Sequence, residues 1–179
     1  MKRRYSIKEK KKLLVVLISA VLAGVLGYVE TLIPAVFPAL PYLRVHLSVF
    51  FALFAVLAYT PFESILIWGV RSVVYGLVLD DGYAILFELA AGALAAVVVW
   101  ALRRTRIFGG STMGIPMGIV YAFVYTCLAC IVPRSAAPFG ALAQAMAFYA
   151  VNYLPLGVLA YVALRYLPEY LIFDDKSKV

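Results

Sequence analysis

Apolar residues fill most of the chain in long runs, and short polar breaks separate these runs. A helix that crosses a bilayer needs roughly 20 mainly apolar residues, with about 17–25 workable. Six runs have this length and predict transmembrane helices near 12–29, 44–60, 62–79, 83–102, 113–132 and 141–164. The pattern predicts an all-α membrane protein with one six-helix domain over 12–168, a basic tail over 1–11 and a second tail over 169–179.

The breaks between the runs carry residues that are typical of turns and irregular loops. The first break, ETLIPAVFPALPYLR, contains three prolines and is therefore expected to be non-helical. Pro61 marks a tight turn, and Gly82 lies in a short hairpin, LDDGY. This hairpin is so short that the third and fourth helices are predicted to be antiparallel neighbours.

The basic residues predict how the helices are oriented in the membrane. All but three of the 16 lysines and arginines lie in the N-terminal tail, in the break RRTRIFGGS or at the C-terminal end. Six crossings place these three segments on one side of the membrane. Because cytoplasmic segments are enriched in Lys and Arg, both termini are predicted to be cytoplasmic. The three exceptions are Arg44, Arg71 and Arg134.

Composition excludes several classes of function. The chain is 65% hydrophobic and 14% charged, whereas soluble domains are about half apolar and about a quarter charged. The basic segments explain the net charge of +7 as a topology signal and a contact with anionic lipid, so no nucleic-acid partner is predicted. The chain lacks a phosphate-binding loop, and Cys127 and Cys130 lack the second ligand pair of a zinc site. Neither an enzyme nor a metal or cofactor is predicted.

Arg71 and Glu88 are ionisable residues inside predicted transmembrane helices, where such residues are costly and need a partner or a function. Arg71 lies about 12 Å and Glu88 about 8 Å from the outer ends of their helices, at a rise of about 1.5 Å per residue. These depths allow contact across the LDDGY hairpin. One interpretation is a structural ion pair that fastens two helices. The other is an arginine at the floor of an outward-facing pocket, where it contacts a ligand.

Five further polar residues are predicted to line an outward-facing pocket together with Arg71 and Glu88. They lie in the outer third or near the middle of the membrane, within apolar and aromatic surroundings suited to a solute; they are Arg44, His46, Tyr125, Gln144 and Asn152. Gln144 and Asn152 are eight residues apart and share one face of the sixth helix. The alternative for each is a structural role, such as a hydrogen bond between helices for Asn152.

The first predicted helix carries a stripe of small residues. The stripe consists of Ser19, Ala20, Ala23, Gly24 and Gly27, which recur at helical spacing. Small side chains let a second helix approach closely. That second helix belongs either to the same chain or to another subunit, and the second alternative makes the stripe a docking surface.

Several stretches of residues 13–130 resemble a known family. They are SAVLAGVLG, PALPYLRVHLSVFFAL, ESILIWGVRSVVYGLV and FELAAGALAAVVVWALRR. In these stretches the chain resembles the membrane-embedded substrate-binding (S) components of energy-coupling factor (ECF) transporters, in particular the branch labelled "Gx transporter" or "heptaprenyl diphosphate synthase component I". Arg71 matches an arginine typical of that branch. RVHLSVF and YAFVYTCLA depart from its polar pattern, so the resemblance does not imply a particular ligand.

The resemblance implies a function in the bacterial cell membrane. An S component would bind a vitamin or another small solute from outside, dock on a transmembrane T subunit that is coupled to two ABC ATPases, and release the solute inside. A second class remains open, because scaffold proteins of bacterial cell-wall synthesis similar to MreD have this length and number of helices. A subunit of a lipid-processing enzyme is a third alternative.

Overall fold

The computed structural model describes residues 7–34, 44–105, 107–131 and 141–166, and helices make up most of this part. Five of the six main helices in the described part are long and apolar enough to cross a membrane, and the sixth, α2, is shorter. The helices are α1 (Ile7–Leu32), α2 (Val49–Ala58), α3 (Pro61–Leu79), α4 (Gly82–Leu102), α5 (Gly114–Ile131) and α6 (Leu142–Tyr166), with a short 3₁₀ helix, η1 (Gly110–Thr112), before α5. The structure confirms the predicted six-helix membrane bundle.

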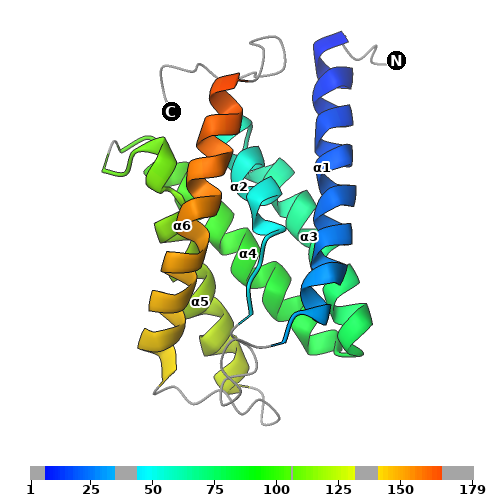
Figure 1. Cartoon of the computed structure of the whole chain (residues 1–179), viewed down its shortest axis with the longest axis vertical. Helices are drawn as coiled ribbons and strands as arrows, with labels where there is room; N and C mark the ends of the chain where they lie inside the picture. Colours follow the sequence, from blue (N-terminus) through cyan, green and yellow to red (C-terminus); the bar gives the residue numbers. More distant parts are fainter. Residues whose placement is uncertain (1–6, 35–43, 106, 132–140, 167–179) are drawn as a thin grey trace.

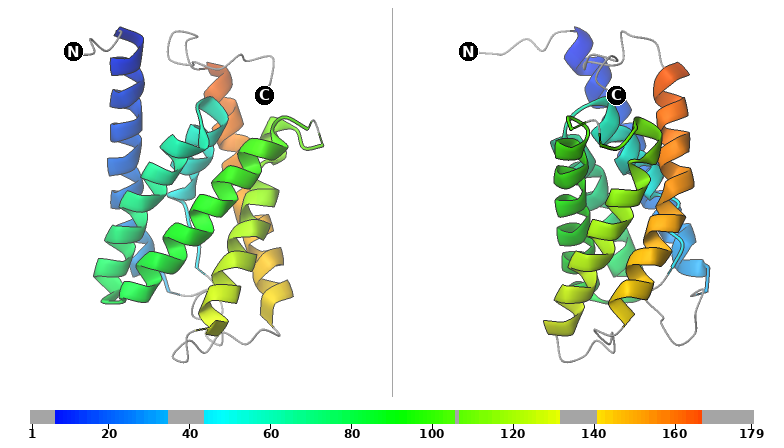
Figure 2. Two further views of the ribbon diagram at one scale, coloured as in Figure 1. Left: turned by 180° about the vertical axis from the view of Figure 1, so that it is seen from behind. Right: turned by 90° about the vertical axis from the view of Figure 1, so that its left-hand side faces the viewer.

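The five long helices stand side by side around α2 (Figure 1). α1 packs on α3, α3 on α4, α4 on α5 and α5 on α6, while α2 packs on α1, α3, α4 and α6. Figure 2 shows this order from two further sides. α1 begins and α6 ends at one end of the bundle, which we call the basic end because α1 begins there with several lysines. The turn between α3 and α4 lies at the opposite end, the turn end.

The second helix is shorter than the sequence predicts. A continuous helix was expected over 44–60, but residues 44–48 are not helical and α2 begins only at Val49. Figure 1 shows the non-helical segment running from the turn end toward the middle of the bundle, where α2 starts. Ten residues of helix span about 15 Å, roughly half of a hydrocarbon core. Non-helical backbone at this depth is tolerated where it is buried in protein, and His46 and Ser48 of this segment are buried.

Charged side chains from other elements satisfy both ends of α2. At its start, the Ser48 amide donates a hydrogen bond to Oε1 of Glu30 at 2.5 Å. At its end, Nη1 of Arg103 donates to the carbonyls of Val56 and Leu57, at 3.0 and 2.7 Å. A carboxylate at the amino end and a guanidinium at the carboxyl end both oppose the helix dipole favourably. Burial lowers the pKa of Arg103, and Arg104 adds to this shift.

The turn between α3 and α4 confirms the predicted hairpin, although Asp80 rather than Gly82 takes the unusual backbone conformation. Asp80 has φ 52° and ψ 40°, a left-handed conformation that aspartate tolerates better than most residues. The side chain of Asp81 then accepts hydrogen bonds from the amides of Tyr83 and Ala84, at 2.9 and 3.3 Å, and so caps the start of α4. α3 and α4 are therefore antiparallel neighbours, as predicted.

The small-residue stripe of α1 packs within the chain. Its five residues are all buried, and α1 lies against α3. A Cβ atom on Gly24 would contact Val70 and Val74 at 3.4 Å, and one on Gly27 would lie 3.3 Å from Cγ of Arg71. Of the two alternatives for the stripe, the structure shows the one within the same chain. Docking of another subunit on these residues would require α1 to separate from α3.

Candidate functional site

Arg71 of α3 lies at the centre of a buried cluster of polar side chains. It is 1% exposed, and each of its three side-chain nitrogens donates a hydrogen bond. Nε donates to Oγ of Ser48 at 2.6 Å, Nη2 donates to Oε2 of Glu30 at 3.2 Å, and Nη1 donates to Oε2 of Glu88. We call Glu30, Ser48, Arg71 and Glu88 the charge cluster. The predicted contact between Arg71 and Glu88 is present as an ion pair.

Three helices, α1, α3 and α4, and the residue directly before α2 position the charge cluster. Glu30 lies near the end of α1 and accepts both from the Ser48 amide and from its hydroxyl, at 2.5 and 3.0 Å. Glu88 of α4 also accepts from the hydroxyl of Tyr121 of α5, at 2.6 Å. Every charged group in the cluster thus has more than one partner. The arrangement ties α1, the start of α2, α3 and α4 together at one depth of the bundle.

One guanidinium engages both carboxylates of this cluster. Arg71 forms ion pairs with Glu30 and with Glu88, and all three side chains are about 1% exposed. Ionised groups removed from water are stable only when they are paired in this way. Nη1 of half-buried Arg44 donates to the carbonyl of Thr31 at 3.2 Å, beside Glu30 in the sequence. In this structure the two ion pairs of Arg71 connect α3 with α1 and α4.

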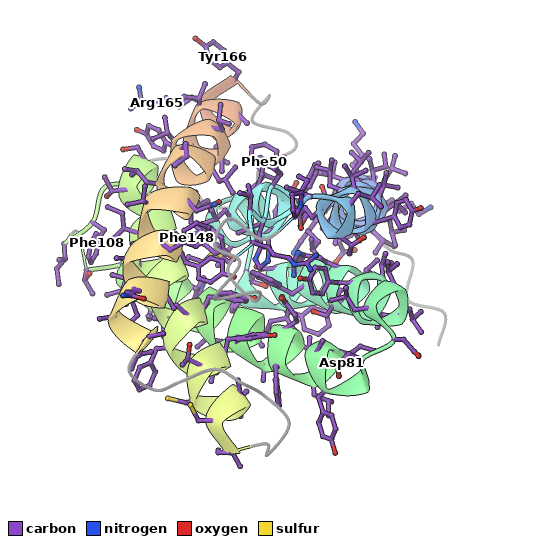
Figure 3. All side chains as sticks on the ribbon, turned by 60° about the horizontal axis from the view of Figure 1, so that its bottom comes forward. Phe50, Asp81, Phe108, Phe148, Arg165 and Tyr166 are labelled. Atoms are coloured by element: carbon purple, nitrogen blue, oxygen red, sulfur yellow. The ribbon has the colours of Figure 1, made fainter. Side chains whose placement is uncertain are left out.

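A cluster of aromatic side chains adjoins the charge cluster and surrounds His46. We call Tyr75, Tyr121, Tyr149 and Tyr153 the tyrosine cluster. Their ring centroids lie 6.1, 5.6, 5.3 and 6.3 Å from that of His46, in the same order. The tyrosines come from α3, α5 and α6, whereas His46 comes from the non-helical segment before α2. Figure 3 looks into this part of the bundle from the turn end, where Asp81 lies.

His46 has one nitrogen that is satisfied and one that is not. Its Nδ1 lies 3.0 Å from the hydroxyl of Tyr153. Its Nε2 has no hydrogen-bond partner among the described residues, although the side chain is only 1% exposed. Nε1 of Trp68 and Oγ of Ser72 are also buried without a hydrogen-bond partner among the described residues. Since buried polar atoms are nearly always paired, Nε2 requires a partner such as a water molecule or a ligand.

Tyr121 connects the two clusters. Its hydroxyl donates to Glu88, and its ring packs at 4.9–5.8 Å against Trp68, Tyr125, Tyr149 and Tyr153. The guanidinium of Arg71 in turn lies over the rings of Trp68 and Tyr75, at 5.0 and 5.2 Å. The two clusters therefore form one continuous site, with a charged part and an aromatic part.

The structure brings together five of the seven residues predicted for the pocket. Arg71 and Glu88 belong to the charge cluster. The tyrosine cluster surrounds His46, and Tyr125 packs beside it on Tyr121. Arg44 donates to the carbonyl next to Glu30. Gln144 is exposed and Asn152 is partly exposed, and neither is placed in the site. The buried face of α6 is therefore shifted by one residue along the sequence from the face that was predicted.

Two important residues of α6 were missed by sequence reasoning. Tyr149 and Tyr153 are 2% and 0% exposed, and together with Ala145 they form the buried face of α6. Phe148, which directly precedes Tyr149, is partly buried against the core, and Figure 3 shows it on the side of α6 that faces the other helices. Polarity favoured Gln144 and Asn152, but two aromatic residues at helical spacing were the better signal for the inward face. The residues described form no group of three or more His, Cys, Asp or Glu that could hold a metal ion.

Comparison of the chain with protein-family models, with curated proteins and with solved structures finds no match. The site therefore has to be interpreted from its own chemistry. It offers a set of aromatic faces, one imidazole nitrogen without a partner among the described residues, and an adjoining arginine that is ion-paired with two glutamates.

Proposed function

We propose that the chain is the membrane-embedded solute-binding subunit of an ECF-type importer in a bacterial cell membrane. In this function it captures a small solute from outside and delivers it through a T subunit that is coupled to two ABC ATPases. The sequence resemblance suggests the family, and the six-helix membrane bundle agrees with it. The sequence has no phosphate-binding loop of its own, so ATP-driven import by this chain requires a partner that hydrolyses ATP.

The unpaired Nε2 of His46 is the observation that carries this proposal. It lies buried among four tyrosine rings, where an unsatisfied polar atom is costly by about 1–3 kcal/mol. A solute that forms a hydrogen bond with Nε2 removes this cost. Aromatic walls with a few convergent polar groups are the usual composition of small-molecule sites. Arg71 lies eight residues before the end of α3 and Glu88 six residues after the start of α4, so the charge cluster lies toward the turn end. The positive-inside rule assigns the turn end to the outside.

The direct test is to isolate the protein from its native membranes in a mild detergent and to identify what accompanies it. Mass spectrometry of the proteins is expected to find a T subunit and two ATPases. Mass spectrometry of small molecules is expected to find one solute, which the variant His46→Phe loses. The variant Tyr83→Phe, at an exposed tyrosine at the start of α4, serves as the control that retains the solute. Isolation without an ATPase partner and without any solute would refute the proposal.

A structural scaffold in cell-wall synthesis, similar to MreD, is the second candidate. One observation favours it, namely that each side-chain nitrogen of Arg71 donates to a partner within the chain, as a structural fastener would. In that case the protein would co-purify with enzymes of cell-wall synthesis, and depletion would change cell shape. The same isolation experiment therefore separates the two candidates by the partner proteins that it recovers.

A further inference from the structure

We propose that the tyrosine cluster binds a flat, uncharged aromatic ring that carries a hydrogen-bonding nitrogen or oxygen, and that Nε2 of His46 forms the hydrogen bond to it. This inference rests on the proposed solute-binding function and deepens it, because it names the chemical class of the solute. It departs from the hypothesis in which Arg71 recognises the ligand. Three features of the site carry it: the pairing of its buried charges, its aromatic surfaces and the position of His46.

The pairing of the buried charges argues against a charged solute. Arg71 donates to Glu30, Ser48 and Glu88, one bond from each of its three side-chain nitrogens. The two carboxylates also accept from other donors, Glu30 from the amide and hydroxyl of Ser48 and Glu88 from the hydroxyl of Tyr121. The charged groups of the cluster therefore already have partners within the chain. A charged solute would be buried without a counter-charge of its own, which is strongly unfavourable away from water, whereas an uncharged solute avoids this cost.

The aromatic surfaces argue for a flat ring. His46 itself shows what the cluster accepts, since its imidazole lies edge-on to Tyr75 and Tyr121, with interplanar angles of 76° and 86°. The same ring is tilted by 34° and 42° relative to Tyr149 and Tyr153. Tyrosine rings prefer such edge-to-face and offset contacts with another aromatic ring. A solute ring placed beside His46 would make contacts of the same kind.

The position of His46 explains how such a ring is admitted. The four tyrosines lie on α3, α5 and α6, whose backbones are held by helical hydrogen bonds. His46 lies on a segment without helical hydrogen bonds, two residues before Ser48. A small shift of this segment makes room in the cluster without breaking a helix. Nε2 can then meet the solute while Nδ1 keeps its contact with Tyr153.

The test uses benzimidazole as the probe and the purified wild-type protein in lipid nanodiscs. Benzimidazole is flat and uncharged at pH 8, and it carries one N–H donor and one acceptor nitrogen, so it suits either tautomer of His46. His46 is the only histidine of the chain, so labelling histidine with ¹⁵N gives the side-chain signals of this residue alone. Saturable binding with a shift of the Nε2 signal is the expected result, and it requires no variant to fold.

Two matched probes and two variants complete the experiment. Indene has the same shape without nitrogen, and 1,3-dimethylbenzimidazolium has the same ring system with a permanent positive charge. Both are expected to bind at least about tenfold more weakly than benzimidazole, because indene loses one buried hydrogen bond and the cation is buried without a counter-charge of its own. His46→Phe is expected to weaken benzimidazole binding by a similar factor, while the control Tyr83→Phe leaves it unchanged.

Three outcomes would overturn the inference: an Nε2 signal that stays unchanged at the highest soluble benzimidazole concentration, indene that binds as tightly as benzimidazole, or the cation that binds as tightly as benzimidazole. The outcomes are separate from those of the proposed function. A charged solute isolated together with a T subunit and ATPases would refute this inference and support the importer. Benzimidazole binding at His46 in a protein that has no ATPase partner would support this inference and refute the importer.

Discussion

Replacing Arg71 by methionine tests the role of the charge cluster most directly. Methionine keeps much of the apolar stem, which packs against Gly27 of α1, so little packing is lost. The substitution removes the positive charge and leaves Glu30 and Glu88 facing the same space, both about 1% exposed. The main effect is therefore electrostatic.

The structure also sets the size of this effect. Breaking a buried ion pair by removing one partner costs about 3–5 kcal/mol. Glu30 keeps two donors, the amide and the hydroxyl of Ser48, whereas Glu88 keeps only the hydroxyl of Tyr121. Without Arg71, the negative charge of Glu88 is therefore less well compensated than that of Glu30. Arg71→Met/Glu88→Gln is expected to recover more stability than Arg71→Met/Glu30→Gln, and the triple variant to recover most of the loss.

Thermal unfolding of the purified protein in one detergent provides the measurement. A loss of about 3–5 kcal/mol in a protein of this size lowers Tm by about 6–20 °C. The binding assay with benzimidazole is run on the same samples, and the triple variant is expected to bind like the wild type. An Arg71→Met protein as stable as the wild type, or a triple variant as unstable as Arg71→Met, would refute the view of Arg71 as a fastener. Lost binding in a stable triple variant would restore Arg71 as a ligand contact.

Three further predictions concern topology and packing. Single cysteines placed at Ser111 and at Ala136 are expected to react with impermeant reagents from opposite sides of the membrane; reaction of both from outside would contradict cytoplasmic termini. Gly118→Ala is expected to lower Tm strongly, because its Cβ would lie 2.3 Å from a backbone oxygen of α6, whereas Gly69→Ala, with 3.9 Å to its nearest neighbour, is expected to have little effect. Arg103→Met is expected to cost about 1–3 kcal/mol, seen as a lower Tm, because it leaves two carbonyls at the end of α2 without their donor.

Hydrophobic patterning predicted most of the fold, because length and apolar content decide which segments cross a membrane. It could not predict where α2 begins. That position depends on Glu30, which lies 18 residues earlier and supplies the acceptor for the Ser48 amide. A contact between distant residues of this kind leaves no periodic signal in the sequence.

The candidate site was predicted only in part, because some of its features also depend on packing between distant residues. Arg71 and Glu88 stood out because charges are rare inside membranes, and the short hairpin constrained their depths. The buried face of α6 was harder to predict, since α6 has apolar residues on every side and polarity alone does not show which side faces inward. Tyr149 and Tyr153 face the interior, where their rings pack on Tyr121. The unpaired nitrogen of His46 follows only from three-dimensional packing.

The two charged caps of α2 have a consequence for how the protein is made. At about 15 Å, α2 is too short to cross the bilayer as an independent segment when it leaves the ribosome. Glu30 has already been synthesised at that moment, but Arg103 follows Leu57 by 46 residues. The carboxyl end of α2 therefore stays uncapped until α4 has been completed. Biogenesis must then include a step in which α2 settles among helices that are already in the membrane, and this step is completed only after the synthesis of α4.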